Sequence, residues 1–440
     1  MDNFYARRQL LMQQLDNDSV VIIVGNCAKT RSKNINYHFR PDNDLYYLTG
    51  FTEPNAVAVL RPEHELEFVL FVRENNAAAE TSFGARAGLE GAKVNFQAND
   101  AFSIADIHQQ LPRLLEQRHK VYLLDEQEFY SEHVSAWLHQ QRRTTGFDVP
   151  KVYRQLLPLQ PLIHNARVIK FDDEIALIRH AVQASIHGHK AMMQQCKPMM
   201  NELQLQAIFD REIANFGCRA VAYPSIVAGG NNGCCLHYEE NNSTLNNGDL
   251  VLIDAGAEYQ QYCSDITRTW PINGKFTEPQ QQIYQLVLAA IDAAIAKVKP
   301  GLVWNEIYQT CMQVLAQGLI ELGIISGSFD EVMQSESYRQ FTVHKTGHWL
   351  GMDVHDVGSY HEDSRSHESN SHWRLLEENM VFTIEPGLYF PSDCLDVAEQ
   401  WRGIAIRIED DILVTATGHE NLSAAIPRTL DEIEAFMQSL

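Results

Sequence analysis

The feature that most constrains the fold of this chain is an order of elements that occurs twice in its C-terminal part. Apolar residues at helical spacing predict two helices, and the β-rich runs that follow them predict a pair of strands. The first copy has helices at 171–196 and 201–217 and strands at 246–256 and 261–272; the second has helices at 278–298 and 304–323 and strands at 378–390 and 403–415. This period is far longer than the roughly 20 to 50 residues of solenoid arrays, so the repeat predicts a domain built from two similar halves.

The two copies carry acidic residues at matching positions. When NGDLVLIDAG (247–256) is aligned with ENMVFTIEPG (378–387), Asp254 falls on Glu385, and in the following strands Asp265 falls on Glu409. A carboxylate at the end of an apolar strand is costly to bury unless it is paired or binds a cation. The repeat therefore predicts a site with pseudo-twofold symmetry, where acidic side chains from both halves converge.

Such a site predicts bound metal ions. Four carboxylates in one cavity would repel one another and stay partly protonated, and two divalent cations would remove this conflict. An oxygen-rich site with one imidazole suits Mn, Co, Fe or Zn, and His348 of HKTGHWLGMDVHDVG (344–358) is the obvious nitrogen ligand. A water held between two such ions loses a proton near neutral pH, which points to hydrolysis. The neutral imidazoles of His355 and His237 are then expected to position the substrate or stabilise a tetrahedral intermediate.

Each of these residues also has an ordinary structural interpretation. A single Asp that closes a strand is more often a turn residue, and a single His near Gly is more often a hydrogen-bonded turn or core residue. Arg407 lies two residues before Glu409, on the same strand face, and could be only its ion-pair partner. The zinc-protease pattern HExxH is excluded, since no Glu follows His344. The hypothesis rests on the joint pattern of two hairpins with acids at matching positions.

The first 165 residues or so predict a separate α/β layer domain. We expect buried strands at 19–25, 57–62 and 67–72, a helix at 103–117 that begins at Ser103, and a proline-containing connector at 149–170. The domains are therefore predicted as 1–165 and 166–440. In the second domain, we expect Asp172 or Asp173 to cap the first helix, and the polar stretch 359–373 to be a solvated surface insertion without a metal.

Composition excludes several classes of protein. A net charge of −22 opposes binding to nucleic acid or to anionic membrane surfaces, because both require clustered Lys and Arg. The eight cysteines include no CxxC pair and predict free thiols rather than a disulfide framework. We find no apolar run near the roughly 18 residues of a membrane span and no signal peptide, so we expect a cytoplasmic location.

Four blocks of the sequence resemble the signatures of the aminopeptidase P family, the Xaa-Pro aminopeptidases with the pita-bread fold. They are IDAGAEYQQYCSDITRTWPINGKF, HWLGMDVHDVG, TIEPGLYF and RGIAIRIEDDILVT, and RPDNDLYYLTGFTEPNAV resembles a stretch of the N-terminal domain of the bacterial enzymes. The resemblance implies an α/β N-terminal domain, which shapes access to the site, and a duplicated αα-ββ catalytic domain of the α+β class. It also implies release of the N-terminal residue from peptides with proline second, by a hydroxide that bridges two metal ions, and assembly as a homodimer or homotetramer.

The resemblance further implies the role of each site residue. Two ions, usually Mn²⁺, would be held by Asp254 and Asp265 on one side and His348 and Glu385 on the other, with Asp265 and Glu409 bridging. The substrate site would be lined by His237, His344, His355 and Arg407, with His355 at the scissile carbonyl and His237 on the proline side. The sequence departs from the family at Lys345 and Thr346, where Gly and a small apolar residue are common. It departs again at Ser82, where bacterial members often have a Trp that reaches a neighbouring subunit.

Two other functions stay open at this point. A prolidase, which cleaves only Xaa-Pro dipeptides, shares the fold and all five metal ligands. The N-terminal segment DLYYLTGF and the segment RGIAIRIEDD favour the aminopeptidase. Cleavage of Xaa-Pro-Xaa but not of Xaa-Pro separates the two enzymes. A catalytically inactive protein-binding relative would be expected to have lost ligands, and this sequence has lost none.

Overall fold

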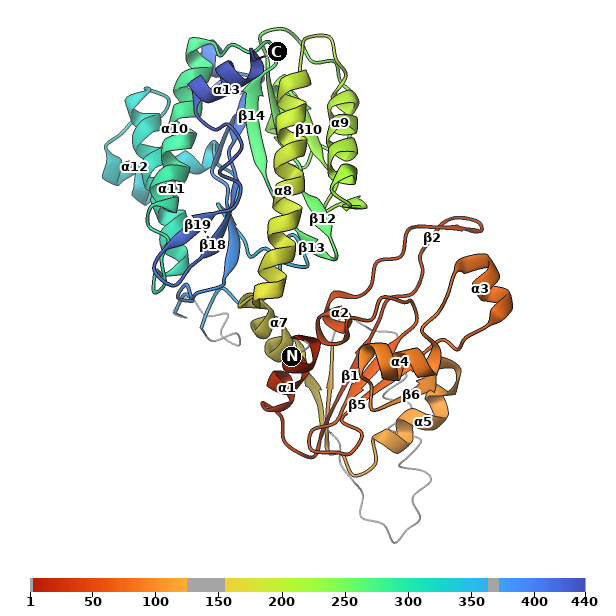
Figure 1. Ribbon diagram of the computed structural model, residues 1–440. Coiled ribbons are helices and arrows are strands. Elements are labelled where there is room, and N and C mark those ends of the chain that lie inside the picture. Colours follow the sequence, from red (N-terminus) through yellow and green to blue (C-terminus); the bar gives the residue numbers. More distant parts are fainter. Residues whose placement is uncertain (1–2, 125–154, 363–371, 440) are drawn as a thin grey trace. The chain divides into compact units, whose positions relative to one another are not determined.

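The computed structural model describes residues 3–124, 155–362 and 372–439 (Figure 1). The chain divides into two compact units, Met1–Ala166 and Arg167–Leu440. Within the described part of the chain, no helix combines the length and the apolar character that a bilayer span requires.

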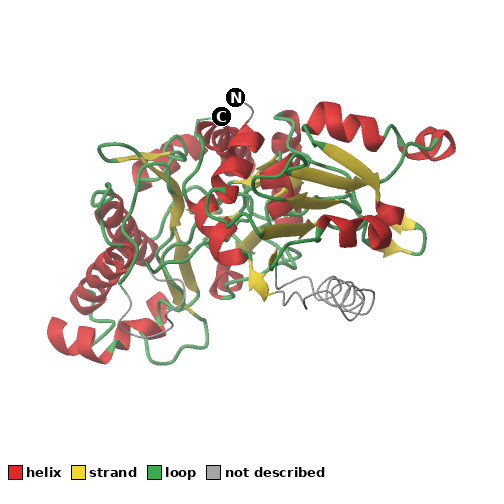
Figure 2. Ribbon diagram, turned by 90° about the horizontal axis from the view of Figure 1, so that it is seen from below, coloured by secondary structure: helices red, strands yellow, loops and turns green. Residues whose placement is uncertain are grey.

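The N-terminal unit is built on a mixed sheet with the strand order β6-β5-β4-β1-β7-β8. All residues of β1, β4 and β5 are buried, as expected for strands that are covered on both faces. Figure 2 shows helices flanking these strands. The strands are β1 (Ser19–Val24), β2 (Thr30–Ser32), β3 (Ile35–Asn36), β4 (Val57–Leu60), β5 (Phe68–Val72), β6 (Asp100–Ser103), β7 (Lys120–Leu123) and β8 (Gln155–Pro158), and the helices are α1 (Asn3–Met12), α2 (Asn43–Thr49), α3 (Ala77–Phe83), α4 (Gly88–Phe96) and α5 (Ile107–Leu114). Helix α7 (Gln160–Val168) begins in this unit and ends in the second one.

The helical segment expected from Ser103 onward is present. Ser103 is the last residue of β6, paired with Val72 of β5, and is also the N-cap of a short 3₁₀ helix, Ile104–Asp106, which leads directly into α5 at Ile107. Two details differ from the expectation: the Ser103 side chain makes no capping hydrogen bond, and α5 ends at Leu114 rather than at residue 117. The expected connector at 149–170 holds β8 and α7 from residue 155 onward, and its residues 149–154 lie outside the described part.

The C-terminal unit contains the predicted repeat. Helices α8 (Asp172–Gln195) and α9 (Glu202–Asn215) form one pair and α10 (Glu278–Ile295) and α11 (Trp304–Glu321) the other, and Figure 1 shows the two pairs on opposite sides of the strands. The remaining elements are β9 (Ala220–Val221), β10 (Ile226–Gly229), β11 (Leu250–Asp254), β12 (Ala257–Tyr259), β13 (Tyr262–Cys263), β14 (Thr267–Pro271), α12 (Phe329–Ser335), β15 (Val381–Ile384), β16 (Gly387–Phe390), β17 (Ile404–Arg407), β18 (Asp410–Val414), β19 (His419–Asn421) and α13 (Leu430–Met437).

Each predicted strand pair is divided into two short ladders. In the first half β11 pairs with β14 and β12 with β13; in the second half β15 pairs with β18 and β16 with β17, all antiparallel. The acidic residues lie at the breaks: Asp254 ends β11, and Glu385 lies between β15 and β16. Gly256 permits the first break, because a Cβ there would lie 1.8 Å from the carbonyl oxygen of Ser264. The duplicated αα-ββ architecture expected for this unit is confirmed.

The start of α8 differs from its prediction. Neither Asp172 nor Asp173 caps the helix; the N-cap is Phe171, whose backbone N–H donates to the carboxylate of Glu174 at 2.9 Å. The two aspartates lie in the first turn, where their negative charge favours the positive end of the helix dipole. The predicted apolar face is present, with Ile175, Ile178, Val182 and Ile186 all buried.

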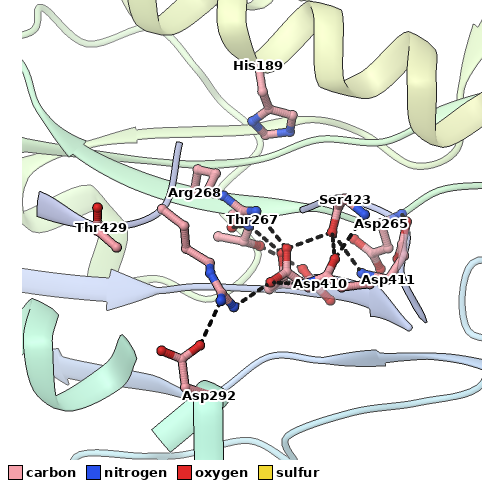
Figure 3. Close-up of polar contacts among 12 residues, drawn as sticks. His189, Asp265, Thr267, Arg268, Asp292, Asp410, Asp411, Ser423 and Thr429 are labelled. Atoms are coloured by element: carbon pink, nitrogen blue, oxygen red, sulfur yellow. Dashed lines mark hydrogen bonds and ion pairs between the residues drawn. The ribbon is translucent and has the colours of Figure 1, made fainter. Parts of the chain in front are cut away.

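An ion-pair network whose central pair, Arg268 and Asp410, is fully buried joins the two halves (Figure 3). Arg268 of β14 donates to the backbone carbonyl of Glu409 and to the carboxylate of Asp410, both at 2.6 Å. The other oxygen of Asp410 accepts from Arg428 at 2.9 Å, and Arg428 also contacts Asp292 of α10. Burial would raise the pKa of Asp410, but Arg268 and Arg428 lower it to about 2. The carboxylate is therefore charged and depends on its two partners.

We predict that Arg268→Met destabilises the protein strongly, because it leaves Asp410 buried with a weaker set of partners. Breaking one side of a buried pair costs about 3–5 kcal/mol. Urea unfolding of the variant measures the loss, and Arg268→Met/Asp410→Leu should recover part of it. The control is Arg211→Met, which removes an exposed pair with Glu212 and should cost no more than about 1 kcal/mol. Equal effects of the two single variants would contradict the structural role of the network.

Candidate metal centre and substrate cavity

All nine residues singled out in the sequence line one cavity of about 410 Å³ in the C-terminal unit. The four acidic residues come from the strand breaks and ends of the two halves, and the histidines come from the segments 230–237 and 344–355. The set consists of Asp254, Asp265, Glu385, Glu409, His237, His344, His348, His355 and Arg407. The fold therefore gathers side chains that are up to 172 positions apart in the sequence, from His237 to Glu409.

The carboxylates and imidazoles lie close enough to share cations. Three groups of candidate ligand atoms lie within 4.8 Å of one another: Asp254 with Asp265 and Glu409; His348 with Glu385 and Glu409; and Asp265 with His348 and His355. Glu409 belongs to the first two groups and Asp265 to the first and third, which is the arrangement that bridging carboxylates would have. These groups include all five residues that were expected to hold metal.

His348 presents one ring nitrogen to the carboxylates. Its Nδ1 lies 2.9 Å from the backbone carbonyl of Trp349, so the proton of the neutral ring sits on Nδ1. The lone pair on Nε2 then faces Asp265 at 3.3 Å and Glu385 at 3.9 Å. Metal-binding histidines typically donate their other ring N–H to a carbonyl in this way. Burial would lower the pKa of His348, but the hydrogen bond to Asp265 and the charges of Asp265 and Glu385 raise it to about 9.

The pKa values of the carboxyl groups also indicate that the site lacks positive charge. Burial raises the pKa of Glu385 to about 8 despite the nearby His348 and Arg407. Burial, together with the charges of Asp265, Glu385 and Asp254, raises the pKa of Glu409 well above its usual range. Divalent cations would stabilise all these groups in the charged form. The donor set of four carboxylates and one oriented imidazole therefore fits two such ions.

Tyr223, which the sequence did not single out, closes one side of the acidic cluster. Its hydroxyl oxygen lies 2.6 Å from Asp254 and 2.5 Å from Asp265. A phenol has only one proton to donate, so it satisfies one of these carboxylates, and the other needs a proton or a cation. Tyr223 follows β9 and lies in the segment between the helix pair and the strand pair of the first half, and no spacing rule connects it with Asp254.

Arg407 is part of a chain of hydrogen-bonded groups that runs from Asp254 through Tyr389 to His344. Its guanidinium donates to Asp254 at 2.6 Å and to the hydroxyl of Tyr389 at 2.9 Å. The Tyr389 hydroxyl lies 2.7 Å from Nε2 of His344, whose Nδ1 lies 2.7 Å from the carbonyl of Lys345. His344 Nδ1 therefore carries the proton, and Nε2 accepts from Tyr389. Burial and the charge of Arg407 lower the pKa of His344 to about 4, so its ring is neutral.

Arg407 does not simply pair with Glu409, the ordinary alternative raised by the sequence. Its carboxylate partner is Asp254 of the other half, and Glu409 accepts a hydrogen bond from Thr267 at 2.8 Å instead. The β16–β17 register brings Arg407 opposite Gly387 and sets Tyr389 two residues further along β16. This register could not be read from the chain, so Tyr389 was also missed.

His355 and His237 are exposed to the cavity. The ring of His355 lies 4.1 Å from that of His348, and burial together with His348 lowers the pKa of His355 to about 4. The next residue, Asp356, is held by buried ion pairs to Arg167 at 2.6 Å and Lys170 at 2.8 Å. These pairs anchor the turn that carries His355.

The places where the sequence departs from the family lie in different environments. Lys345 is exposed and lines the cavity, and Thr346 is buried beside it. Ser82 lies in α3 of the N-terminal unit and is exposed. Of the polar stretch 359–373, residues 363–371 lie outside the described part; among the rest, Tyr360 and Trp373 line the cavity, so this stretch is not wholly a solvated surface.

Comparison with known proteins identifies the family of the chain. The model of metallopeptidase family M24 matches residues 176–416, and that of the aminopeptidase P N-terminal domain matches residues 4–122. The chain is 39% identical to the Xaa-Pro aminopeptidase of Escherichia coli strain K12, with 99% of this chain and 97% of that protein covered.

Solved structures show the same likeness over the whole chain. The structure of Pseudomonas aeruginosa aminopeptidase PepP matches with a TM-score of 0.95 at 40% identity, covering 99% of this chain and 97% of that one. The structure of proline aminopeptidase P II from Yersinia pestis matches with a TM-score of 0.93 at 41% identity, covering 100% and 99%. The chain therefore belongs to the aminopeptidase P group of metallopeptidase family M24.

Proposed function

We propose that Asp254, Asp265, His348, Glu385 and Glu409 hold two Mn²⁺ ions, and that this centre cleaves the bond between an N-terminal residue and a following proline. The hydrolysis itself follows from the family: the chain is a metal-dependent hydrolase that releases the N-terminal residue before proline. The observation that supports the site is the meeting of four carboxylates and one oriented imidazole in a single cavity. Manganese suits a site in which oxygen donors dominate.

The bound cations would supply Lewis-acid polarisation of the scissile carbonyl and an activated water. The protein's own residues bind and orient the peptide around them. The neutral ring of His355, next to His348, is placed to donate a hydrogen bond to the oxygen of the tetrahedral intermediate. His237 lines the same cavity and is assigned to the proline side of the substrate. Arg407 holds Asp254 and Tyr389 in place, so we assign it an orienting role.

An aromatic wall suits the substrate's proline ring. Trp304 stacks on Tyr360 with ring centroids 5.0 Å apart, and both line the cavity together with Tyr308 and Trp373. The amide that precedes proline has no N–H, so a site that binds it cannot depend on that hydrogen bond and must recognise shape. An apolar surface beside the carboxylates meets this requirement.

The alternatives carried from the sequence are not favoured. A dipeptide-only prolidase is disfavoured because the relatives that match 99% of the chain are Xaa-Pro aminopeptidases. An inactive binding module is disfavoured because each expected ligand position holds a competent donor that faces the cavity.

We further propose that the chain acts in the cytoplasm as a homodimer or homotetramer on peptide substrates, without nucleic acid or membrane partners. The net charge of −22 supports the last part, because phosphate backbones and anionic lipids would be repelled. Light scattering at several protein concentrations measures the assembly, and a monomeric mass throughout would contradict it. In this proposal the predicted N-terminal domain, residues 1–165, shapes the assembly and substrate access, and the predicted second domain, residues 166–440, carries the chemistry.

Removing a ligand should remove activity without unfolding the chain. We predict that Glu385→Ala and His348→Ala each lower kcat for Ala-Pro-Ala at least 1,000-fold and reduce the bound metal, because a catalytic metal site need not carry the stability of the core. Steady-state kinetics measures kcat, metal analysis measures the bound metal, and circular dichroism checks that the chain stays folded. The matched control is Glu378→Ala, an exposed glutamate seven residues before Glu385, which should leave both unchanged. Near-normal hydrolysis by either ligand variant would contradict the assignment.

The substrate-facing histidines should behave differently from the ligands. We expect His355→Ala to lower kcat by about 100- to 1,000-fold, the cost of removing one donor to a developing oxyanion, while the bound metal stays unchanged. His237→Ala should raise KM more than it lowers kcat, since it is assigned to proline binding. Steady-state kinetics with parallel metal analysis checks both. Loss of metal in His355→Ala would instead identify this residue as a ligand, as its place beside Asp265 and His348 also permits.

A further inference from the structure

Lys345 places a positive charge at the edge of the acidic cavity. It follows His344 and precedes Thr346, whose carbonyl accepts a hydrogen bond from the backbone N–H of Glu385 at 3.0 Å. The backbone of Lys345 is thus fixed close to the carboxylate end of the site. Its side chain lines the same cavity as Asp265 and Glu409.

The ammonium group of Lys345 is available to a ligand. The side chain is exposed, and among the described residues its Nζ contacts the ring of Tyr308, 4.5 Å from the centroid, and no carboxylate. An exposed cation–π contact contributes only about 0.5–1 kcal/mol, so it orients the lysine without neutralising it. A lysine stem of four carbons leaves the group free to shift toward a bound anion.

Arg407, the other permanently charged cation among the described residues that line the cavity, is already paired. Arg407 is buried and bound to Asp254 and Tyr389, so its charge is used inside the site. The described cavity therefore combines carboxylates around the candidate metal centre with the exposed ammonium group of a lysine beside Tyr308. A peptide with a free amino group and a downstream carboxylate would align with this polarity, because the lysine repels the first and attracts the second.

We propose that Lys345 determines specificity by binding a carboxylate on the residue that follows proline. That carboxylate is either the free C-terminus of a tripeptide or the side chain of Asp or Glu. An extended peptide advances about 3.3–3.6 Å per residue, so two residues beyond the scissile carbonyl reach roughly 7 Å, a distance within the span of a lysine whose backbone lies beside Glu385. This role rests on the Xaa-Pro aminopeptidase activity and deepens it.

Two pairs of peptides separate the two sources of the carboxylate. Ala-Pro-Ala and its C-terminal amide differ only in the terminal charge, and Ala-Pro-Asp-amide and Ala-Pro-Asn-amide differ only in the side-chain charge. Each is assayed with wild-type protein loaded with Mn²⁺, with Lys345→Met and with Lys345→Glu. The control is Lys297→Met, an exposed lysine just beyond α10 that is not among the residues lining the cavity.

We expect wild-type protein to favour the charged member of at least one pair by about three- to fivefold in kcat/KM, as an exposed ion pair permits. The preference should lie in KM, vanish in Lys345→Met, reverse in Lys345→Glu and weaken as salt is raised, whereas Lys297→Met keeps the wild-type ratio. The pair that responds identifies the source of the carboxylate.

For each pair, the test compares kcat/KM for the charged peptide with kcat/KM for the neutral one. If this ratio is the same in wild type and Lys345→Met for both pairs, the proposal is overturned, even where wild-type protein prefers the charged peptide. Hydrolysis of the peptides would then still support the Xaa-Pro activity. Failure of wild-type protein to cleave any of the four peptides would instead count against the activity, so the two failures are distinguishable.

Discussion

Mutual repulsion among four carboxylates, two buried and two half-buried, is the constraint on which the rest of this structure depends. Asp254, Asp265, Glu385 and Glu409 share one cavity, and burial opposes the charged form of each. Asp254 pairs with Arg407, which lowers its pKa in spite of burial. The other three have raised pKa values, and cations among their oxygens would resolve this conflict.

The duplicated fold explains how these groups are brought together. Each half ends a ladder at a carboxylate, and the halves are joined by backbone contacts next to the acidic residues: the N–H of Glu409 donates to the carbonyl of Thr267 at 3.0 Å. Arg268 binds the carbonyl of the same glutamate and thereby fixes its backbone from the other side (Figure 3). Stability and function are thus linked, because Asp410 directly follows Glu409 in the chain and its partner Arg268 also binds the backbone of that glutamate.

Much of this could be predicted from the sequence, because periodicity and the long repeat are local signals. The repeat indicated both helix pairs, both strand pairs and the matched acids, and the family blocks added the histidines and Arg407. Tyr223 and Tyr389 were missed, since their contacts depend on strand register and on segments that only the tertiary fold brings close. Ser103 was correctly expected at the start of a helical segment, but residue types alone did not indicate that its first turn is 3₁₀ and that the α-helix follows from Ile107.

Diffraction at the manganese absorption edge tests the central claim most directly. Crystals of the Mn²⁺-loaded protein should give two anomalous peaks in the cavity, roughly 3.5 Å apart, one beside Asp254 and one beside His348, with Asp265 and Glu409 contacting both. Protein that cleaves Xaa-Pro peptides while its crystals show no metal at these carboxylates would contradict the account.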